Sequence, residues 1–364
     1  MSRVAVLGTA VVAAALVAAA PAVAGHDSSG AFPPGYTFAY NDGYVGWPVA
    51  PTSEQHPLRG TLNDPRPGGY LNGVTIAVDD AHPDPEAPAG RAHRVYAVES
   101  GIAQVPSTAG VGCVNRQLTV GHFQYWSVDP TVTAGQAVEA GEPIGWTCRS
   151  LYAMHLSEVQ TLDGAAVYVN PLHAGGKLGT YRDSAAPEIR SIRFFAPSDI
   201  SWYTYSNALW SDVTGTELDA NNLRGLVDVR ALIAEPQSDQ SFLAGSPLAV
   251  ELAPYKVRLS VHDAVGALVL DRTVFQSDFH LAHPGFVDRD SHFAPGTRQN
   301  LGPTACLDGQ PQDCQGTQWF RLFATPAGRY WDTAQVKKGL YSLTVEAWDL
   351  AGNSTRRTVQ LRVK

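Results

Sequence analysis

The chain has 364 residues and is acidic, with a formal net charge of −8 at pH 7 and an isoelectric point near 5.7. It has no basic stretch that would neutralise phosphates, so the composition argues against nucleic acid as a partner. Charged residues make up only 16% of the chain, which also contains 34 Gly and 25 Pro. That composition is typical of many short strands and turns rather than long helices.

The N-terminal segment has the pattern of an export signal. Residues 1–24 contain one Arg, then an apolar run rich in Ala and Val, and end in Ala-Val-Ala just before Gly25. This pattern predicts a secretory signal peptide, because the apolar run is short for a spanning helix and leads into a small-residue cleavage site. We expect a protein that is secreted, periplasmic or on the cell surface, with no membrane span after cleavage.

The rest of the chain divides into an arm and two domains. Residues 25–55 are rich in Gly, Pro and aromatic residues without sustained periodicity, which predicts an extended arm. The remaining length exceeds what one core usually organises, so two domains are expected. Residues 56–182 read as short strands with frequent turns, and after a polar link a second domain is expected over 187–364, starting with the alternating strand 189–194.

The second domain shows the alternation of a sheet with one buried face. Leu343, Val345 and Ala347 share one face of an expected strand, and residues 349–353 read as the turn into the last strand. Such a chain buries its core between two sheets. The sequence therefore predicts an all-β protein whose C-terminal domain is an immunoglobulin-like β-sandwich.

Four cysteines in an exported chain indicate disulfides before metal ligands. Cys306 and Cys314 flank a short polar loop, and Cys113 and Cys148 lie together in the first half of the chain. Of the three possible connectivities we predict Cys113–Cys148 and Cys306–Cys314. The chain has no CxxC pair, which argues against structural zinc held by these thiols.

Seven segments follow one another in the order found in the M23 peptidase family, which includes LytM and lysostaphin. They are PLRGTLNDPR, YLNGVTIAV, RVYAVESGIAQV, FQYWSV, VTAGQAVEAGEPIGW, AMHLSEVQ and YVNPL. The resemblance covers residues 56–175 and is most specific over 132–145 and 169–172. It implies a compact antiparallel β fold and the activity of a zinc endopeptidase that cuts peptide cross-links of the bacterial cell wall.

The resemblance also implies a zinc site with a defined set of ligands. In the family, zinc is held by the His and Asp of an H-x-G-x-D motif and by the second His of an H-x-H motif. The first His of H-x-H and a His after an aromatic pair help catalysis. Three protein ligands leave one position open for a water that the metal acidifies. Of the H-x-G-x-D motif this sequence keeps only the glycine, as Gly73.

The other positions of these motifs are almost all replaced. Leu71 stands at the first zinc-binding His and Thr75 at the Asp, and the aromatic pair Tyr125-Trp126 is followed by Ser127 in place of a catalytic His.

In AMHLSEV, the register that best matches the family places Ala153 at the other catalytic His and His155 at the last zinc ligand. A register two residues later makes His155 the catalytic His and Ser157 the ligand. The H-x-H motif is broken in both registers.

One imidazole does not hold zinc in a protein. We therefore expect a pseudoenzyme without catalytic residues and without a cofactor. Its groove is expected to bind peptidoglycan or a cell-envelope protein, with Tyr125, Trp126 and His155 as the binding residues.

Two other functions stay open at this stage. The first is an active zinc metalloendopeptidase whose ligands have been relocated to nearby residues, for which the candidates are Asp79, Asp80, His82, His93 and His122. The polar, Pro-rich loop that carries the first three is typical of a solvated surface, which disfavours this reading. The second is a structural or adhesion protein of the envelope in which both domains serve as spacers.

Some further polar residues have a simpler structural interpretation. Glu158 is interpreted as a carboxylate at a strand end, and His155 is either a hydrogen-bonded structural histidine or part of a residual binding site. A second dense group in the C-terminal domain has irregular spacing and is interpreted as a solvated loop rather than a metal site; it comprises His280, His283, Asp288, Asp290 and His292.

Overall fold

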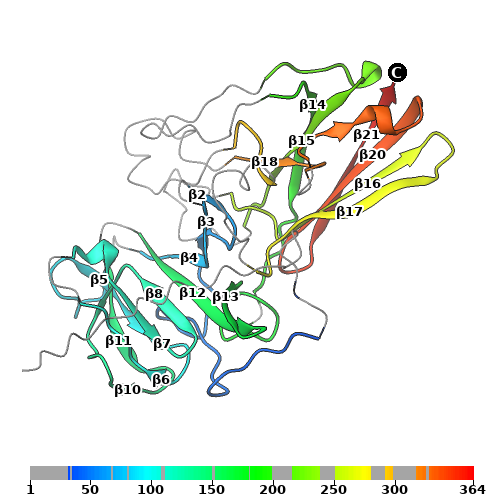
Figure 1. The fold of residues 1–364 in the computed structure, drawn as a ribbon. Coiled ribbons are helices and arrows are strands. Elements are labelled where there is room, and N and C mark those ends of the chain that lie inside the picture. The colour runs from blue at the N-terminus through cyan, green and yellow to red at the C-terminus, as the bar shows by residue number, and fades with distance from the viewer. Residues whose placement is uncertain are drawn as a thin grey trace, which may run out of the picture.

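The protein is described by a computed structural model over most of its length, and the described part is all-β, as the sequence predicts. The described residues are 32, 35–66, 69–79, 82–107, 111–149, 152–179, 181–198, 215–237, 251–279, 292–297, 317–324 and 328–364. Figure 1 shows two groups of strands, an N-terminal half that ends before residue 182 and a C-terminal half that begins with β14. Within the described residues, three single-turn 3₁₀ helices accompany them: η1 (Cys113–Asn115), η2 (Ala220–Asn222) and η5 (Thr333–Gln335).

The N-terminal half is built on one large sheet. Its order is β1 (Leu58–Gly60), β4 (Val74–Ala77), β12 (Ala153–Leu162), β8 (Phe123–Trp126) and β7 (Gln117–Val120), and β13 (Ala165–Val169) also pairs with β12. All these pairs are antiparallel.

Smaller sheets complete this half. A three-stranded sheet has the order β5 (Arg91–Tyr96), β11 (Pro143–Cys148) and β9 (Val128–Pro130). Two hairpin-sized sheets pair β6 (Gly101–Ile102) with β10 (Ala137–Val138) and β2 (Pro65–Arg66) with β3 (Gly69–Tyr70).

The C-terminal half has two four-stranded sheets. One contains β14 (Glu188–Phe195), β15 (Leu226–Ala234) and β18 (Gln318–Arg321), with β19 (Trp331–Asp332) also paired with β15. The other has the order β17 (Leu268–Gln276), β16 (Lys256–Asp263), β20 (Gly339–Trp348) and β21 (Ser354–Val363).

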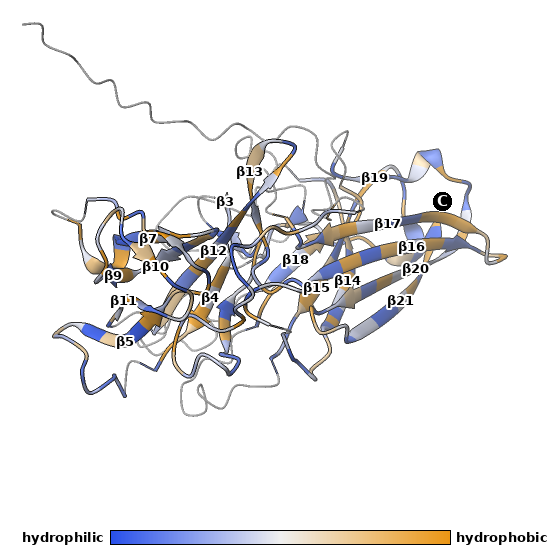
Figure 2. Ribbon diagram, turned by 90° about the horizontal axis from the view of Figure 1, so that it is seen from below, coloured by the Kyte–Doolittle hydropathy of each residue, from blue (hydrophilic) through white to orange (hydrophobic). Residues whose placement is uncertain are grey.

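Strand alternation places the C-terminal core between these two sheets. Leu343, Val345 and Ala347 are fully buried, as predicted, while the residues between them on β20 are partly exposed. They share one hydrophobic cluster with residues of the facing sheet, among them Val229 and Phe320. The alternation appears in Figure 2 as bands of hydrophobic and hydrophilic residues along β16 and β21.

The two halves interlock through residues that cross into the opposite core. Tyr70 of β3 is buried in the C-terminal cluster, and Leu252 is buried in the N-terminal one. Polar contacts reinforce the junction: Asn63 Nδ2 donates to the Phe279 carbonyl at 2.7 Å, and Asn170 Nδ2 donates to the Ser277 carbonyl at 2.8 Å. Buried apolar and hydrogen-bonded contacts of this kind oppose separation of the halves.

The predicted arm lies along the N-terminal half. Val49 pairs with Val95, and Trp47 is buried in the N-terminal core. Farther upstream, Phe38 stacks on the His173 ring with 3.5 Å between ring centroids. The arm therefore contributes side chains to the core instead of merely covering it.

Candidate functional site

The residues singled out by the zinc motifs meet on the central strand of the large sheet. His155 of β12 lies directly opposite Thr75 of β4 on one side and Trp126 of β8 on the other. Successive side chains of a strand point to opposite faces. Met154 and Leu156 accordingly enter the N-terminal core, while His155 lies on the other face. We call this other face, with Asn72, Thr75, Trp126, His155 and Ser157, the His155 face.

His155 is held by neutral polar partners. Its Nε2 atom lies 2.9 Å from Asn72 Oδ1 and 3.0 Å from Ser157 Oγ, and its Nδ1 atom lies 3.5 Å from Thr75 Oγ1. Burial, followed by the positive charge of Arg66, lowers the pKa of His155 to about 3. The imidazole is therefore neutral near pH 7.

This donor set does not fit a zinc ion. Zinc sites in proteins use Cys, His and carboxylate ligands, whereas the atoms around His155 are amide and hydroxyl oxygens. A nearby guanidinium that already disfavours protonation of His155 also disfavours a divalent cation there.

The replaced motif positions have structural roles of their own. Ser127 adopts the left-handed conformation, with φ of 61°, and its hydroxyl donates to the Val114 carbonyl at 2.9 Å. Ala153 is 8% exposed. The backbone of Leu71 pairs with Asn63 and Asp64, accepting from the amide of the first and donating to the carbonyl of the second.

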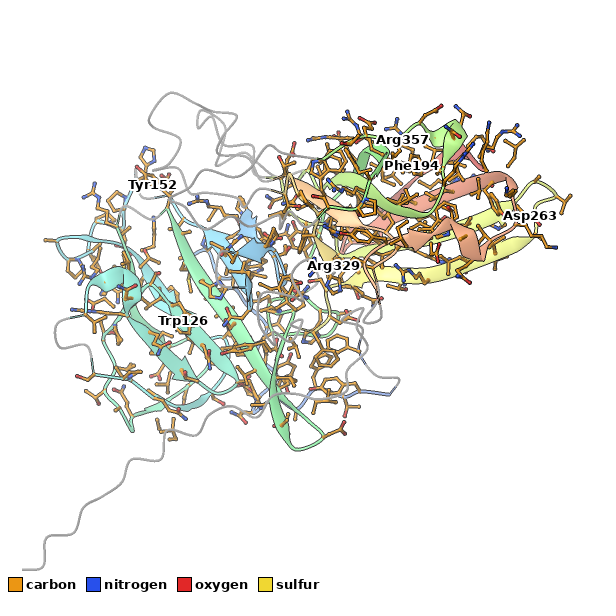
Figure 3. All side chains as sticks on the ribbon, turned by 45° about the horizontal axis from the view of Figure 1, so that its top comes forward. Trp126, Tyr152, Phe194, Asp263, Arg329 and Arg357 are labelled. Carbon is orange, nitrogen blue, oxygen red and sulfur yellow. A yellow bond between two sulfur atoms is a disulfide. The ribbon has the colours of Figure 1, made fainter. Side chains whose placement is uncertain are left out.

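The aromatic pair points in two directions. Tyr125 is fully buried in the N-terminal core, where its hydroxyl accepts a hydrogen bond from the Val98 amide at 2.8 Å. Trp126, labelled in Figure 3, is only partly buried and lies beside His155, and its indole Nε1 atom has no partner among the described residues. Tyr125 is thus corrected from a binding residue to a core residue, because adjacent strand residues face opposite ways.

The candidates for relocated zinc ligands do not gather into one ligand cluster among the described residues. His82 is exposed and pairs with Asp79 at 2.7 Å, and the Nε2 atom of His93 contacts the Asp79 carbonyl at 2.6 Å. His122 instead contacts Glu99, with 2.9 Å between Nδ1 and Oε2. Asp80 lies outside the described residues. Within the described part of the chain, no cluster of three close ligand groups includes a histidine.

Glu158 does not lie at a strand end, where the sequence predicted it. It lies inside β12 and is fully buried, so its interpretation as a strand-end carboxylate is wrong. Tyr40 donates to its Oε1 atom at 2.7 Å, and Gln160 Nε2 donates to the same atom at 2.8 Å. Burial, followed by the charge of Glu158, raises the pKa of Tyr40, so the tyrosine stays a neutral donor. This contact fastens the arm to β12.

The predicted cysteine pairing is confirmed where it is described. Cys113 and Cys148 form a disulfide with 5.7 Å between Cα atoms, joining η1 to β11. Cys306 and Cys314 lie outside the described residues, as do His280, His283, Asp288 and Asp290. His292 is described and is buried, with its Nδ1 atom 3.3 Å from the Tyr70 hydroxyl.

Sequence reasoning missed a group of three carboxylates, Asp183, Glu235 and Asp349. One carboxylate oxygen from each residue lies within 4.8 Å of those of the other two. The residues are far apart in the chain and carry no local motif, so nothing in the sequence pairs them.

Comparisons with protein-family models, curated proteins and solved structures find no match to this chain. Among the described residues, no helix has the length and hydropathy needed to cross a membrane.

Proposed function

We propose that the N-terminal half is an M23 peptidase-like domain that has lost its zinc centre and binds peptide strands of peptidoglycan, or of a cell-envelope partner, without cutting them. In the same proposal the protein is exported and the C-terminal half is an immunoglobulin-like sandwich. The observation that carries the proposal is the position of His155, opposite Thr75 and beside Trp126, with neutral partners where a peptidase needs charged or imidazole ligands.

Two features support binding at the His155 face. Trp126 offers a partly exposed aromatic surface and an indole N–H that no described group accepts. That N–H is itself buried, so the exposed part of the ring is the surface that a bound peptide would contact. Arg66 adds a positive charge that acts on His155, and the carboxylate of Asp64 partly offsets that charge.

Metal content and hydrolysis test the loss of activity. The purified mature chain is expected to contain less than stoichiometric zinc and to release no dye from labelled cell walls, even with added zinc. Stoichiometric zinc together with dye release that a chelator abolishes would establish the active peptidase instead.

Co-sedimentation with purified peptidoglycan tests binding. Trp126→Ala is expected to weaken binding about tenfold, because buried aromatic anchors dominate such interfaces. The matched control is Trp348→Ala, since Trp348 is also partly buried but contacts Lys256 in the C-terminal half. Equal binding by both variants would remove the His155 face from the proposal. A wild-type chain that binds no peptidoglycan and no envelope protein would favour a spacer role.

Rebuilding the ligands tests the assigned register. Leu71→His with Thr75→Asp would combine with His155 to form the family's ligand set, and zinc is expected to raise the melting temperature of this double variant but not of wild type. Thr75→Asp alone serves as the control because it lacks the second imidazole. A folded double variant whose melting temperature does not change with zinc would show that these residues are misassigned.

A further inference from the structure

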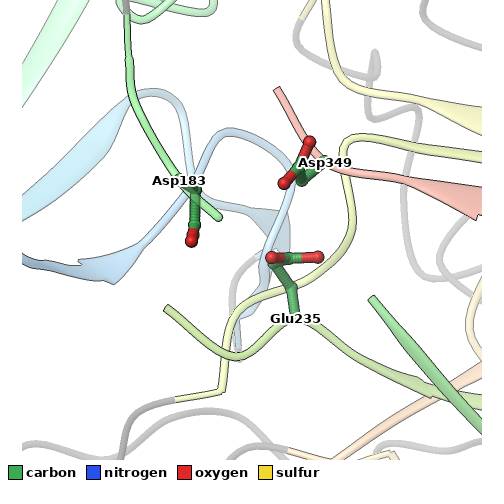
Figure 4. A group of neighbouring side chains, drawn as sticks. All are labelled: Asp183, Glu235 and Asp349. Carbon is green, nitrogen blue, oxygen red and sulfur yellow. The ribbon is translucent and has the colours of Figure 1, made fainter. Parts of the chain in front are cut away.

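Three carboxylates from distant segments meet at the junction of the two halves. Asp183 belongs to the link that precedes β14, Glu235 follows β15 directly, and Asp349 follows β20 at the turn into β21. Figure 4 shows the three side chains converging from separate segments of the chain. We call this group the junction carboxylates.

Burial makes the proximity of these charges costly. Glu235 is 4% exposed and Asp349 is 3% exposed. Burial, then the charges of Asp349 and Asp183, raise the pKa of Glu235 to about 9. Among the described residues, no basic side chain forms an ion pair with Glu235 or Asp349, although Asn353 donates two hydrogen bonds to Asp349.

Of the three junction carboxylates, Glu235 is the one whose carboxyl group lacks hydrogen-bond partners. Both of its carboxylate oxygens are buried and have no hydrogen-bond partner among the described residues. A buried carboxylate without any donor is rare, because it loses its hydration without compensation. One of its oxygens nevertheless lies within 4.8 Å of a carboxylate oxygen of Asp183 and of one of Asp349.

The backbone holds the junction carboxylates in place independently of any cation. The amide and carbonyl of Glu235 pair with Leu252 at 3.0 and 2.9 Å. Asn353 Nδ2 donates both to Asp349 Oδ2 at 2.6 Å and to the Asp183 carbonyl at 2.8 Å, which joins two of the three segments. A small cavity adjoins the group and is lined by Glu235 and Asp349 together with Asn170, Tyr181, Tyr255 and Ser277.

We propose that the junction carboxylates bind a calcium ion. Calcium takes six to eight oxygen ligands in flexible geometry, and three carboxylates supplemented by carbonyl oxygens and water suit it. Magnesium requires a stricter octahedral arrangement and retains its water, and zinc prefers nitrogen and sulfur ligands that this group lacks. The ion neutralises the mutual repulsion and supplies partners to the two free oxygens of Glu235.

The position of the site gives calcium a structural consequence. Asp183 lies in the link between the halves, whereas Glu235 and Asp349 belong to the C-terminal half. A bound ion therefore fastens the link to the C-terminal half beside the junction. Calcium is expected to stiffen the connection between the N-terminal and C-terminal halves, independently of what the His155 face binds.

Thermal melting of the full mature chain tests this proposal. Millimolar CaCl₂ is expected to raise the melting temperature of wild type by at least about 3 °C relative to EDTA, and MgCl₂ by clearly less. Glu235→Gln is expected to weaken calcium binding about tenfold, as measured by calorimetry. In EDTA the same variant is expected to melt above wild type at pH 9 and higher, where Glu235 ionises and the variant removes one of three repelling charges.

A second pair of variants distinguishes the loss of a calcium ligand from the loss of a carboxylate that only caps a hairpin turn. Asp349 accepts from the Asn353 amide, and Asp263 accepts from the Val265 and Ala267 amides in the β16–β17 turn, so both carboxylates cap a hairpin. Asp263 lies at the far end of the C-terminal half (Figure 3). Asp349→Asn is expected to lose the calcium response, and Asp263→Asn to keep it.

Two outcomes would overturn the calcium site. A wild-type chain that does not respond to calcium, while Glu235→Gln still melts higher, would show that the carboxyl groups only share a proton. A Glu235→Gln variant that responds to calcium as wild type does would place the ion elsewhere.

Discussion

The His155 face and the junction carboxylates both bury polar groups, but they do so in opposite ways. At the first, an imidazole with a pKa lowered to about 3 is neutral and lies among amide and hydroxyl groups. At the second, three acidic groups meet, and the pKa of Glu235 is raised to about 9. The His155 ring is satisfied by neutral neighbours, whereas both carboxyl oxygens of Glu235 lack partners among the described residues.

Because of this contrast, the proposed family resemblance suggests zinc at His155, whereas the buried carboxyl groups suggest calcium at Glu235. The proposed resemblance directs attention to His155, whose described neighbours are amide and hydroxyl groups. The cost of burying unbalanced charge directs attention to Glu235, where no motif exists. Substitutions at the His155 face and at the junction carboxylates, followed by measurements of the free energy of unfolding, test this contrast.

The largest effect is expected from the loop that supports the His155 face. A Cβ atom on Gly73 would lie 2.1 Å from the Leu156 carbonyl oxygen, which belongs to the backbone of β12. Gly73→Ala is therefore expected to lower the free energy of unfolding by about 3 kcal/mol or more, measured by urea denaturation. Gly112→Ala is the control, because that glycine has open space around it and φ of −60°. A change below about 0.5 kcal/mol in both variants would contradict the close packing of this loop on β12.

A smaller effect is expected at the junction carboxylates. Asn353→Ala removes the amide that donates to Asp349 and to the Asp183 carbonyl, so it should cost about 2 kcal/mol in unfolding free energy. Asn221→Ala provides the comparison, since its exposed amide makes one 3.3 Å contact with Asp219. If the two variants lose equal stability, the amide of Asn353 does not hold the junction carboxylates together.

The smallest effect is a pH dependence at His155. Its pKa is about 3 in the folded protein and 6.5 when unperturbed. Between these values the unfolded chain binds more protons, so this group's contribution to stability is complete above pH 6.5 and is lost as the pH falls towards 3. The slope is at most about 1.4 kcal/mol per pH unit.

His155→Gln should reduce that slope between pH 6.5 and about 5, where few ordinary carboxylates titrate. The measurement is urea denaturation of both proteins across this range. Parallel curves for variant and wild type would mean that His155 is not held neutral by the fold.

Much of the fold was predictable because it follows local alternation. The buried face of β20 and the turn at residues 349–353 were read from spacing alone, and Cys113–Cys148 followed from an even number of cysteines and their positions. The opposite directions of Tyr125 and Trp126 were also available from strand parity, yet the motif treated them as one aromatic pair. Glu158 was misjudged because the tyrosine that covers it belongs to the distant arm.

The sequence by itself determined many of the strands and their buried faces, because both depend on residues that are neighbours in the chain. Only the tertiary structure decided that His155 lies opposite Thr75, that Tyr70 and Leu252 enter each other's cores, and that Glu235 meets two more carboxylates. Such contacts join residues tens to hundreds of positions apart. Their energies depend on register, burial and the sum of charges in three dimensions, which no local pattern encodes.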